Sequence, residues 1–318
     1  MSDRYLSRRE FFIGSGAILV VTAAGVACTS KSVSPLPAPG TIEAKQTGAA
    51  AISLLSSDSP VKSGKSYFGF DLTTQDGQLL TGGSPRVWMA PGKNTKAGGP
   101  FTATWHPFGD AYTRFHDHSP KSPLTGVYAT EIDVPSTGNW SVAAEVSSGS
   151  HRAVGVGALP VVDIPIPAEV GTKATSVSTP VATTTQGLKQ ICTRNPPDPM
   201  HYVSLDKALT NSRPTVVTFA TPLLCTSKLC GPVVDEQLAA FTKIGGQRAN
   251  FIHVEEFLPG PSLKPPPATA ENTSPAFKAW KFQSEPWTIV IDKHGIIQGR
   301  FEGPFTAPQI EAAVQPLL

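Results

Sequence analysis

Short apolar runs separated by turn sequences fill the first half of the chain. The runs Tyr67–Leu72, Val87–Ala90, Val127–Val134 and Trp140–Val146 are each followed by a turn sequence that contains Gly. Strands of this length with turns at this spacing are typical of an antiparallel β-sandwich. The alternation in the last two runs places one side of each strand inward. We therefore predict an all-β sandwich domain over residues 50–165.

A different order of elements occupies the second half. An apolar strand is expected at 215–220, a helix at 232–244 and a second strand at 250–254. The series continues with a short helix, two strands around a Lys-His-Gly turn and a last helix, at 275–282, 287–292, 296–302 and 307–317. Strand, helix, strand, helix, hairpin and helix in this order predict a layered α/β domain with a mixed sheet over residues 188–318.

Composition supports two folded units and excludes one class of partner. A length of 318 residues exceeds one typical domain, and 31 Pro and 28 Gly indicate a loop-rich, β-containing secreted protein. The formal charge of +2 provides no basic face, so nucleic acid is not expected as a partner. Residues 166–187 are mostly Thr, Ser, Ala, Val and Gly and show no period that a core could use. We predict that they form a Ser/Thr-rich linker.

The N-terminus has the order of a signal peptide: charged, then apolar, then small residues. Arg8-Arg9 and two Phe precede an apolar stretch from Ile13 to Ala27, which resembles the twin-arginine export signal. A transmembrane anchor is the alternative, but it usually needs about 18 to 20 apolar residues, and this stretch is shorter and interrupted by Gly.

The apolar stretch ends at Gly25-Val26-Ala27-Cys28, which is similar to a bacterial lipobox. The resemblance implies that residues 1–28 are a signal peptide, that Cys28 receives a lipid and that residues 29–49 form a tether. The protein would then be exported and lipid-anchored to the outer face of the cytoplasmic membrane. Plain cleavage, with Cys28 removed or free, is the alternative, because the family prefers Leu where Gly25 stands.

Within the predicted sandwich, residues 126–146 resemble immunoglobulin-like modules of secreted bacterial lipoproteins. The resemblance lies in a Gly-x-Tyr strand, a Pro-Ser-Thr-Gly turn and a strand that begins with Trp. It implies an immunoglobulin-like N-terminal domain. The aromatic residues of this region, Trp88, Trp105, Tyr128 and Trp140, are expected in its core rather than in a ligand site.

Residues 192–318 resemble the thioredoxin-like proteins in three features. Cys225 and Cys230 follow the first long strand at the start of the predicted helix, residues 284–288 with Pro286 stand where the family has its cis-proline, and residues 289–297 match its closing hairpin. The resemblance implies an α/β thioredoxin-like fold. It also implies protein thiols or disulfides as partners and a substrate groove shaped by Pro286.

The position of Cys225 before a helix favours a reactive thiol. Unpaired backbone N–H groups and the positive end of the helix dipole stabilise a thiolate there, and Lys228 would add to that field. Four residues separate Cys225 from Cys230, whereas thioredoxins have two between their cysteines. On one regular helix an offset of five residues is about 140° around the axis, so the sulfurs meet only if Cys225 lies in the loop or the first turn unwinds. We predict that Cys225 attacks and Cys230 resolves in thiol–disulfide exchange, with no cofactor.

A peroxidase is a second interpretation of the same pair. The spacing of Cys225 and Cys230 after Phe219-Ala220-Thr221-Pro222 is similar to that of peroxiredoxins of the bacterioferritin-comigratory type. In that family the first cysteine reduces peroxide and the second resolves the sulfenic acid. Arg248 and Arg300 are the candidates for the family's activating arginine.

Two further interpretations need no catalysis. Copper chaperones of the Sco class bind metal through two nearby cysteines and a distant histidine, a place for which His201, His253 and His294 are candidates. Alternatively, the pair, or one of its members with Cys192, forms a structural disulfide in a binding module. Cys192 is followed by three prolines and is expected in an irregular arm that could lie across the domain, as a resolving thiol, a third ligand or an inert core residue.

His106, His116 and His118 with Asp117 form the histidine cluster of the predicted sandwich. In an extended segment His116 and His118 would share one face, which suits a metal. The neighbouring Gly, Ser and Pro residues favour polar loop residues over a metal site.

Overall fold

The structure, a computed structural model, describes residues 52–56, 60–74, 79–91, 95–109, 125–148, 151–164, 166–225, 229–257 and 269–318. The chain divides into two units, Met1–Pro35 and Leu36–Leu318, and all described residues belong to the second. The predicted signal peptide, Cys28 and the tether lie outside the described residues. Within the described part of the chain, no helix combines the length and the apolar character that crossing a membrane requires.

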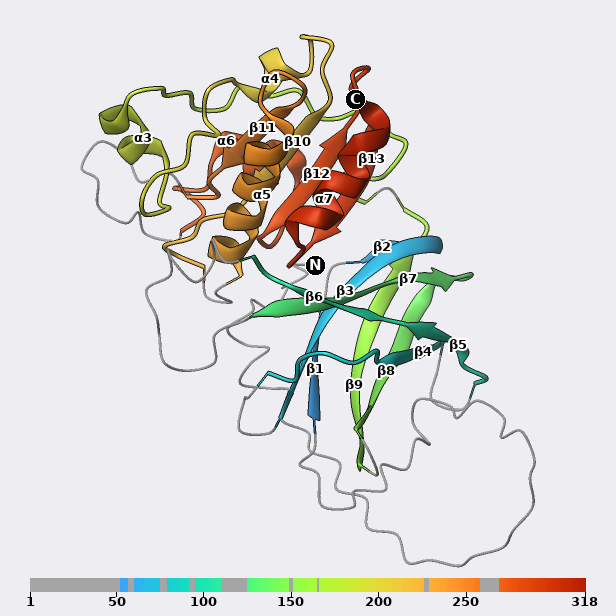
Figure 1. The fold of residues 1–318 in the computed structure, drawn as a ribbon. Coiled ribbons are helices and arrows are strands. Elements are labelled where there is room, and N and C mark those ends of the chain that lie inside the picture. The colour runs from blue at the N-terminus through green and yellow to red at the C-terminus, as the bar shows by residue number, and fades with distance from the viewer. Residues whose placement is uncertain are drawn as a thin grey trace, which may run out of the picture. The chain divides into compact units, whose positions relative to one another are not determined.

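Strands β1 to β9 form two sheets (Figure 1). The first has the order β1 (Ile52–Ser56), β3 (Gly64–Thr74), β7 (Gly126–Val134) and β6 (Thr104–Pro107), and all its neighbouring strands are antiparallel. The second has the order β2 (Val61–Lys62), β9 (His151–Val162), β8 (Gly138–Ser148), β4 (Arg86–Ala90) and β5 (Gly98–Thr102). Its neighbours are antiparallel except β2 and β9, which are parallel.

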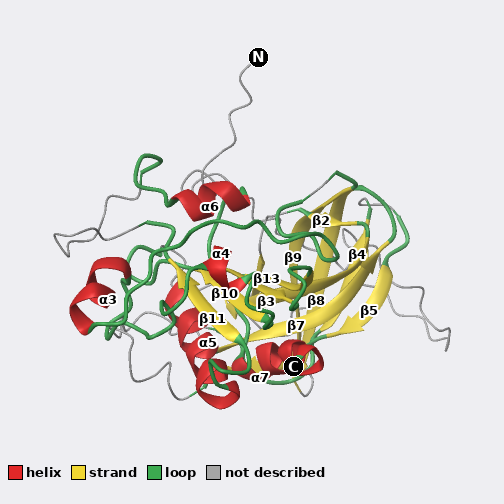
Figure 2. Cartoon of the chain, turned by 90° about the horizontal axis from the view of Figure 1, so that it is seen from above, coloured by secondary structure: helices red, strands yellow, loops and turns green. Residues whose placement is uncertain are grey.

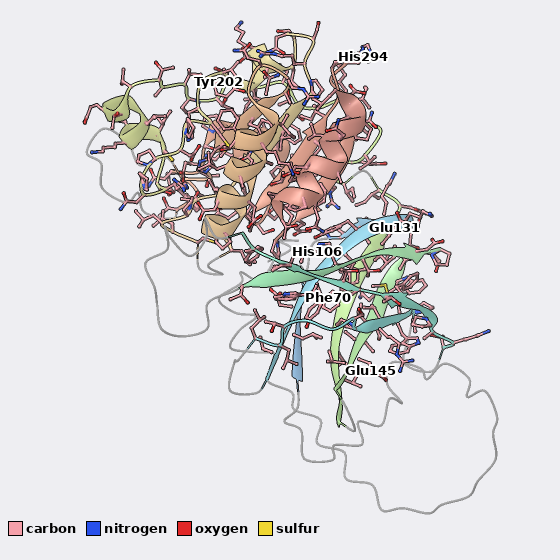
Figure 3. The ribbon with its side chains drawn as sticks, in the orientation of Figure 1. Phe70, His106, Glu131, Glu145, Tyr202 and His294 are labelled. Carbon is pink, nitrogen blue, oxygen red and sulfur yellow. A yellow bond between two sulfur atoms is a disulfide. The ribbon has the colours of Figure 1, made fainter. Side chains whose placement is uncertain are left out.

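One apolar core joins the inner faces of these two sheets. Phe70 of β3 and Tyr128 of β7 pack with Trp140 and Val142 of β8, and all four side chains are buried. Phe70 is labelled among the side chains of Figure 3. The prediction that alternate residues of β7 and β8 face inward is confirmed. The immunoglobulin-like assignment and the boundaries 50–165 stay predictions.

A third sheet is formed by residues of the second half of the chain. Its order is β11 (Asn250–Val254), β10 (Thr215–Phe219), β12 (Trp287–Ile291) and β13 (Ile297–Glu302). Strands β10 and β11 are parallel, while β12 is antiparallel to both β10 and β13. The predicted mixed sheet in a layered α/β arrangement is confirmed, with strand ends within about two residues of the predicted ones.

Helices cover both faces of this sheet. Alternate residues of each strand point to opposite faces, so the side chains of one strand pack against helices on both sides. On one face Val216 packs with residues of α5 (Cys230–Ile244) and α7 (Ala307–Val314), which ends in a short 3-10 turn at Gln315–Leu317. On the other face Val217 packs with residues of α4 (Leu205–Ala208) and α6 (Pro275–Trp280). Figure 2 shows α6 on the opposite side of the sheet from α5 and α7.

The sequence around α5 explains where this helix begins and ends. Pro232 is the third helical residue, where the missing backbone N–H costs no intrahelical hydrogen bond. Gly245 ends the helix with a φ of 87°, a left-handed value that favours glycine. The helix therefore begins two residues before the predicted Pro232, so that Cys230 becomes its first residue.

The segment predicted as a linker lies along the third sheet. Lys173 forms an antiparallel bridge with Ile296, and the N–H of Ala174 donates to the carbonyl of Gly295 at 2.8 Å. Ala174 is buried, and α3 (Thr185–Ile191) begins within the same segment. This segment is held by backbone hydrogen bonds rather than by large apolar side chains. Its contact with the sheet therefore leaves no apolar period in the sequence.

Candidate functional site

Cys225 and Cys230 form a disulfide between a loop and the first turn of α5. Their Cα atoms are 5.9 Å apart. After β10 the carbonyl of Thr221 accepts hydrogen bonds from the N–H groups of Leu224 and Cys225, at 3.1 and 3.0 Å, which closes a turn that ends at Cys225. Cys225 thus lies in the loop, which is one of the two conditions under which the sulfurs were expected to meet.

The two sulfurs lie in different environments. Cys230 is fully buried, whereas Cys225 is only partly buried. The N–H of Cys230, at the N-terminus of α5, donates to Sγ of Cys225 at 3.3 Å. This N–H has no intrahelical acceptor, and it would stabilise a thiolate at Cys225. Lys228, which was expected to add to this field, lies outside the described residues.

Glu285 completes the site, and sequence analysis did not identify it. One carboxylate oxygen of Glu285 and the sulfurs of Cys225 and Cys230 all lie within 4.8 Å of one another. The Glu285 side chain is buried and hydrogen bonds to Thr221, at the end of β10. One signal in the sequence pointed to Glu285. It directly precedes Pro286, which was expected to shape the groove beside the two cysteines.

Burial and neighbouring charges favour the neutral form of Glu285. Burial, followed by the nearby carboxylates of Glu256 and Glu255, raises the pKa of Glu285 well above its ordinary range. Burial also raises the pKa of Glu255 to about 7. The site therefore contains a carboxyl group beside the two sulfurs that holds its proton more tightly than an ordinary carboxyl group.

Pro286 follows a cis peptide bond and begins the segment that leads into β12. The next residue, Trp287, is buried and stacks on Phe282 with ring centroids 4.8 Å apart. Arg300 lies over the ring of Trp287, with its guanidinium carbon 4.4 Å from the ring centroid. The substrate groove expected at Pro286 stays a prediction.

Cys192 belongs to a second, fully buried cluster. Its Sγ lies 3.2 Å from Oδ2 of Asp198 and 3.8 Å from Nδ1 of His253, and His201 is the fourth member. Burial raises the pKa of the Cys192 thiol to about 11, so the thiol is protonated. Burial alone would lower the pKa of His253, but the Asp198 carboxylate 2.8 Å away outweighs it and holds this pKa well above its usual range.

The arm that carries Cys192, residues 192–201, is held across the α/β region, as the sequence suggested. Arg194 forms a buried ion pair with Asp235 of α5, with an Nε to Oδ1 distance of 2.7 Å. The N–H and hydroxyl of Thr193 donate to the carboxylate of Glu255 at 2.6 and 2.9 Å. The Thr193 hydroxyl in turn accepts from the N–H of Leu223, at 3.3 Å, in the loop before Cys225.

The remaining predicted residues lie elsewhere or outside the described ranges. Arg248 follows the C-terminal end of α5, at the other end of the helix from Cys230. His294 is exposed in the turn between β12 and β13 (Figure 3). His106 is half-buried on β6, and burial lowers its pKa. His116, Asp117 and His118 lie outside the described residues.

Two groups of side chains in the described part of the chain have ligand atoms close enough to hold a metal ion. One consists of Cys225, Cys230 and Glu285, which supply two sulfurs only when the disulfide is reduced. Within the described ranges this group contains a carboxylate and no histidine, unlike the Cys and His set expected for a Sco-type site. The other is the cluster of Cys192, and it includes both His201 and His253.

Comparison with known proteins gives a structural similarity. No family model matches the sequence, and no curated protein matches it either. Among solved structures, the chain is similar to a thiol:disulfide interchange protein of the thioredoxin family from Chlorobium tepidum TLS. The alignment has 16% identity and a TM-score of 0.31, and it covers 47% of this chain and 97% of that protein.

Proposed function

We propose that this protein is an extracytoplasmic thiol–disulfide oxidoreductase whose catalytic pair is Cys225 and Cys230. The observation that supports this best is the contrast within the disulfide: a partly buried cysteine in a loop, and a fully buried partner at the start of a helix whose N–H donates to the sulfur of the first. A structural disulfide needs neither the difference in exposure nor the hydrogen bond to sulfur. A pair that exchanges with substrate benefits from both, because the less buried cysteine is the one that a substrate can reach and the hydrogen bond stabilises its thiolate.

In the reducing direction, the Cys225 thiolate attacks one sulfur of a substrate disulfide. A bond forms between Cys225 and that sulfur, the substrate disulfide breaks, and the second substrate sulfur leaves as a thiolate. The N–H of Cys230 favours this step because it stabilises the attacking anion before the collision.

In the second step, Cys230 resolves the mixed disulfide. Glu285 first releases its own proton to solvent; its carboxylate then accepts the proton of the Cys230 thiol, and the resulting thiolate attacks Sγ of Cys225. The substrate leaves as a thiolate and the Cys225–Cys230 disulfide forms, so two electrons have passed from the pair to the substrate. The raised pKa of Glu285 brings its proton affinity closer to that of a thiol, which lowers the cost of this transfer. An external dithiol then reduces the pair, and the reverse sequence oxidises substrate thiols.

The test is the reduction of insulin disulfides by the full chain with dithiothreitol as electron donor. We expect the wild-type chain to accelerate the reaction and Cys225→Ser to abolish the acceleration. Cys230→Ser should retain the first step and accumulate a mixed disulfide with the substrate, visible by mass spectrometry. Cys28→Ser is the matched control, because it removes a cysteine outside the pair, and it should retain activity. An unchanged rate in Cys225→Ser would disprove the proposal.

A further inference from the structure

The buried cluster around Cys192 has four side chains of the types that bind zinc. Cys192 and Asp198 come from the arm, His201 follows on the same arm, and His253 comes from β11. One potential ligand atom from each residue lies within 4.8 Å of the other three. Tetrahedral zinc sites, with bonds of about 2.0 to 2.3 Å, hold their ligand atoms roughly 3.3 to 3.8 Å apart. Only small displacements separate the cluster from that geometry.

His201 is the member whose position hydrogen bonding does not explain. The side chain is 2% exposed, and its Nε2 has no hydrogen-bond partner. The nearest acceptor of the cluster, Oδ1 of Asp198, is 3.8 Å away, too far for a hydrogen bond but a normal separation for two ligands of one metal ion. An unsatisfied buried nitrogen is costly, and a bound cation would satisfy it.

His253 has the second contact that metal-binding histidines usually have. Its Nε2 lies 3.0 Å from the carbonyl of Ala220. A neutral imidazole that donates Nε2–H to this carbonyl directs the lone pair of Nδ1 toward Cys192 and Asp198. The N–H of Met200 donates to Oδ1 of Asp198 at 2.9 Å, which fixes the carboxylate in the same way.

The charges of the four ligands fit a divalent ion. A thiolate and a carboxylate supply two negative charges, so a divalent cation makes the buried site neutral, whereas Cu(I) would leave it negatively charged. A carboxylate is also a poor ligand for soft Cu(I), and the set of one sulfur, two nitrogens and one oxygen suits zinc. With four protein ligands and full burial, the site would be closed, as structural zinc sites are.

We propose that Cys192, Asp198, His201 and His253 form a structural zinc site that fastens the arm of residues 192–201 to the third sheet. Coordination replaces the S–H bond of Cys192 and the hydrogen bond between His253 and Asp198, and the released protons pass to solvent. The site is separate from the Cys225–Cys230 pair and does not depend on the proposed redox function.

The test is zinc binding by the full chain, stripped with EDTA and titrated against a chromophoric chelator under reducing conditions. All chains carry Cys28→Ser, so that Cys192 is the single thiol in a Cys225→Ser/Cys230→Ser variant. We expect one zinc per chain in the wild-type background, in this double variant and in His294→Gln, whose imidazole is exposed. Cys192→Ser and His201→Gln should each weaken binding by more than about 100-fold, beyond the loss usual for outer contacts.

Cobalt substitution and thermal unfolding provide readouts that do not depend on activity. The double variant should show a thiolate-to-cobalt charge-transfer band that is lost when Cys192→Ser is added to it, and zinc should raise the Tm of the double variant but not that of this triple variant. His201→Gln should fold without metal, as checked by circular dichroism, because its Nε2 makes no hydrogen bond. Absence of zinc binding in the double variant, unchanged affinity in folded His201→Gln, or a preference for copper(I) would overturn the proposal.

Discussion

At the scale of single residues, the surroundings of a carboxyl group decide what it does. Asp292 is half-buried, which by itself would raise its pKa, but the backbone N–H groups that it accepts in a turn outweigh this and lower its pKa. Glu285 has the same functional group, but burial and two neighbouring carboxylates raise its pKa. The first is a turn residue and the second a potential proton carrier, and only the environment distinguishes them.

Glu285→Gln is expected to slow resolution while leaving the attack by Cys225 unchanged. The amide keeps the shape of the side chain but cannot accept the proton of Cys230, so at a pH where Glu285 is ionised the rate of the second step should fall by about 100-fold. In the wild type this rate should rise with pH as Glu285 ionises. Quenched single-turnover experiments that follow the mixed disulfide would check this, and equal decay of the mixed disulfide in both proteins would contradict it.

Glu256→Gln is the matched variant for this prediction. Removing the charge of Glu256 stabilises the ionised form of Glu285, because two like charges no longer compete. We expect the pH profile of resolution to move toward lower pH with a similar plateau. A profile that moves toward higher pH would argue against the charge coupling.

Asp71→Asn is expected to stabilise the protein at neutral and higher pH. Asp71 on β3 is 5% exposed, and burial raises its pKa to about 7, whereas the unfolded chain has the ordinary value. As pH rises, Asp71 therefore loses its proton in the unfolded chain before it does so in the folded protein. The free energy of unfolding then falls as pH rises from about 4 to about 7. The variant should remove this fall and gain about 2 to 4 kcal/mol at pH 8. Urea unfolding at pH 4 and pH 8 measures the difference, which should be small at pH 4 if the assignment is correct.

At the scale of elements, helix α5 connects the parts of the site. Its first residue, Cys230, is half of the disulfide, and Asp235 in the second turn holds the arm through Arg194. The next residue, Glu236, accepts the N–H of Ala307 at 2.6 Å, at the start of α7, and its other oxygen accepts the N–H of Gly109. One helix therefore positions the resolving sulfur and the arm by contacts less than two turns apart.

Glu236→Ala is expected to lower the free energy of unfolding by about 1 to 3 kcal/mol, because it leaves the buried N–H of Ala307 without an acceptor. Glu236→Gln keeps an acceptor oxygen and should lose less. Glu311→Ala is the control, since it removes an ion pair whose partner Lys243 is exposed, and it should cost no more than about 0.5 kcal/mol. Guanidinium unfolding compares the three, and equal losses in Glu236→Ala and Glu311→Ala would contradict the assigned role.

At the scale of the whole molecule, the site requires a suitable compartment. Disulfides persist in oxidising environments, whereas the cytosol keeps thiols reduced. We propose, from the paired arginines and the residues that end at Cys28, that the chain is exported and held at the membrane by a lipid on Cys28. Export would then let the Cys225–Cys230 pair reach both redox states.

Two sets of substitutions in the full chain test export and anchoring separately. Arg8→Lys with Arg9→Lys should retain the protein in the cytoplasm, with Cys225 and Cys230 reduced. Cys28→Ser should leave export possible but move the protein from the membrane fraction to the soluble fraction, since each buried CH₂ of a lipid contributes about 0.8 kcal/mol to membrane binding. Fractionation and intact mass would measure both, and a membrane-bound Cys28→Ser chain would contradict lipidation.

Local patterns in the sequence determined the strands of the third sheet, helices α5 to α7 and the position of the cysteine pair, but not α3 and α4. Alternation along β7 and β8, the apolar run of β10 and the proline and glycine at the two ends of α5 are properties of neighbouring residues, so they can be found without a fold. The same holds for Cys225 and Cys230, which lie only five residues apart.

Tertiary structure alone decided which distant residues meet. Glu285 stands 60 positions from Cys225 by residue number, and His253 stands 61 from Cys192, and no period or spacing relates them. Their approach depends on the pairing of β10 with β11 and β12 and on the path of the arm across the sheet. Burial then sets the charge of each group, because the cost of removing it from water depends on everything packed around it.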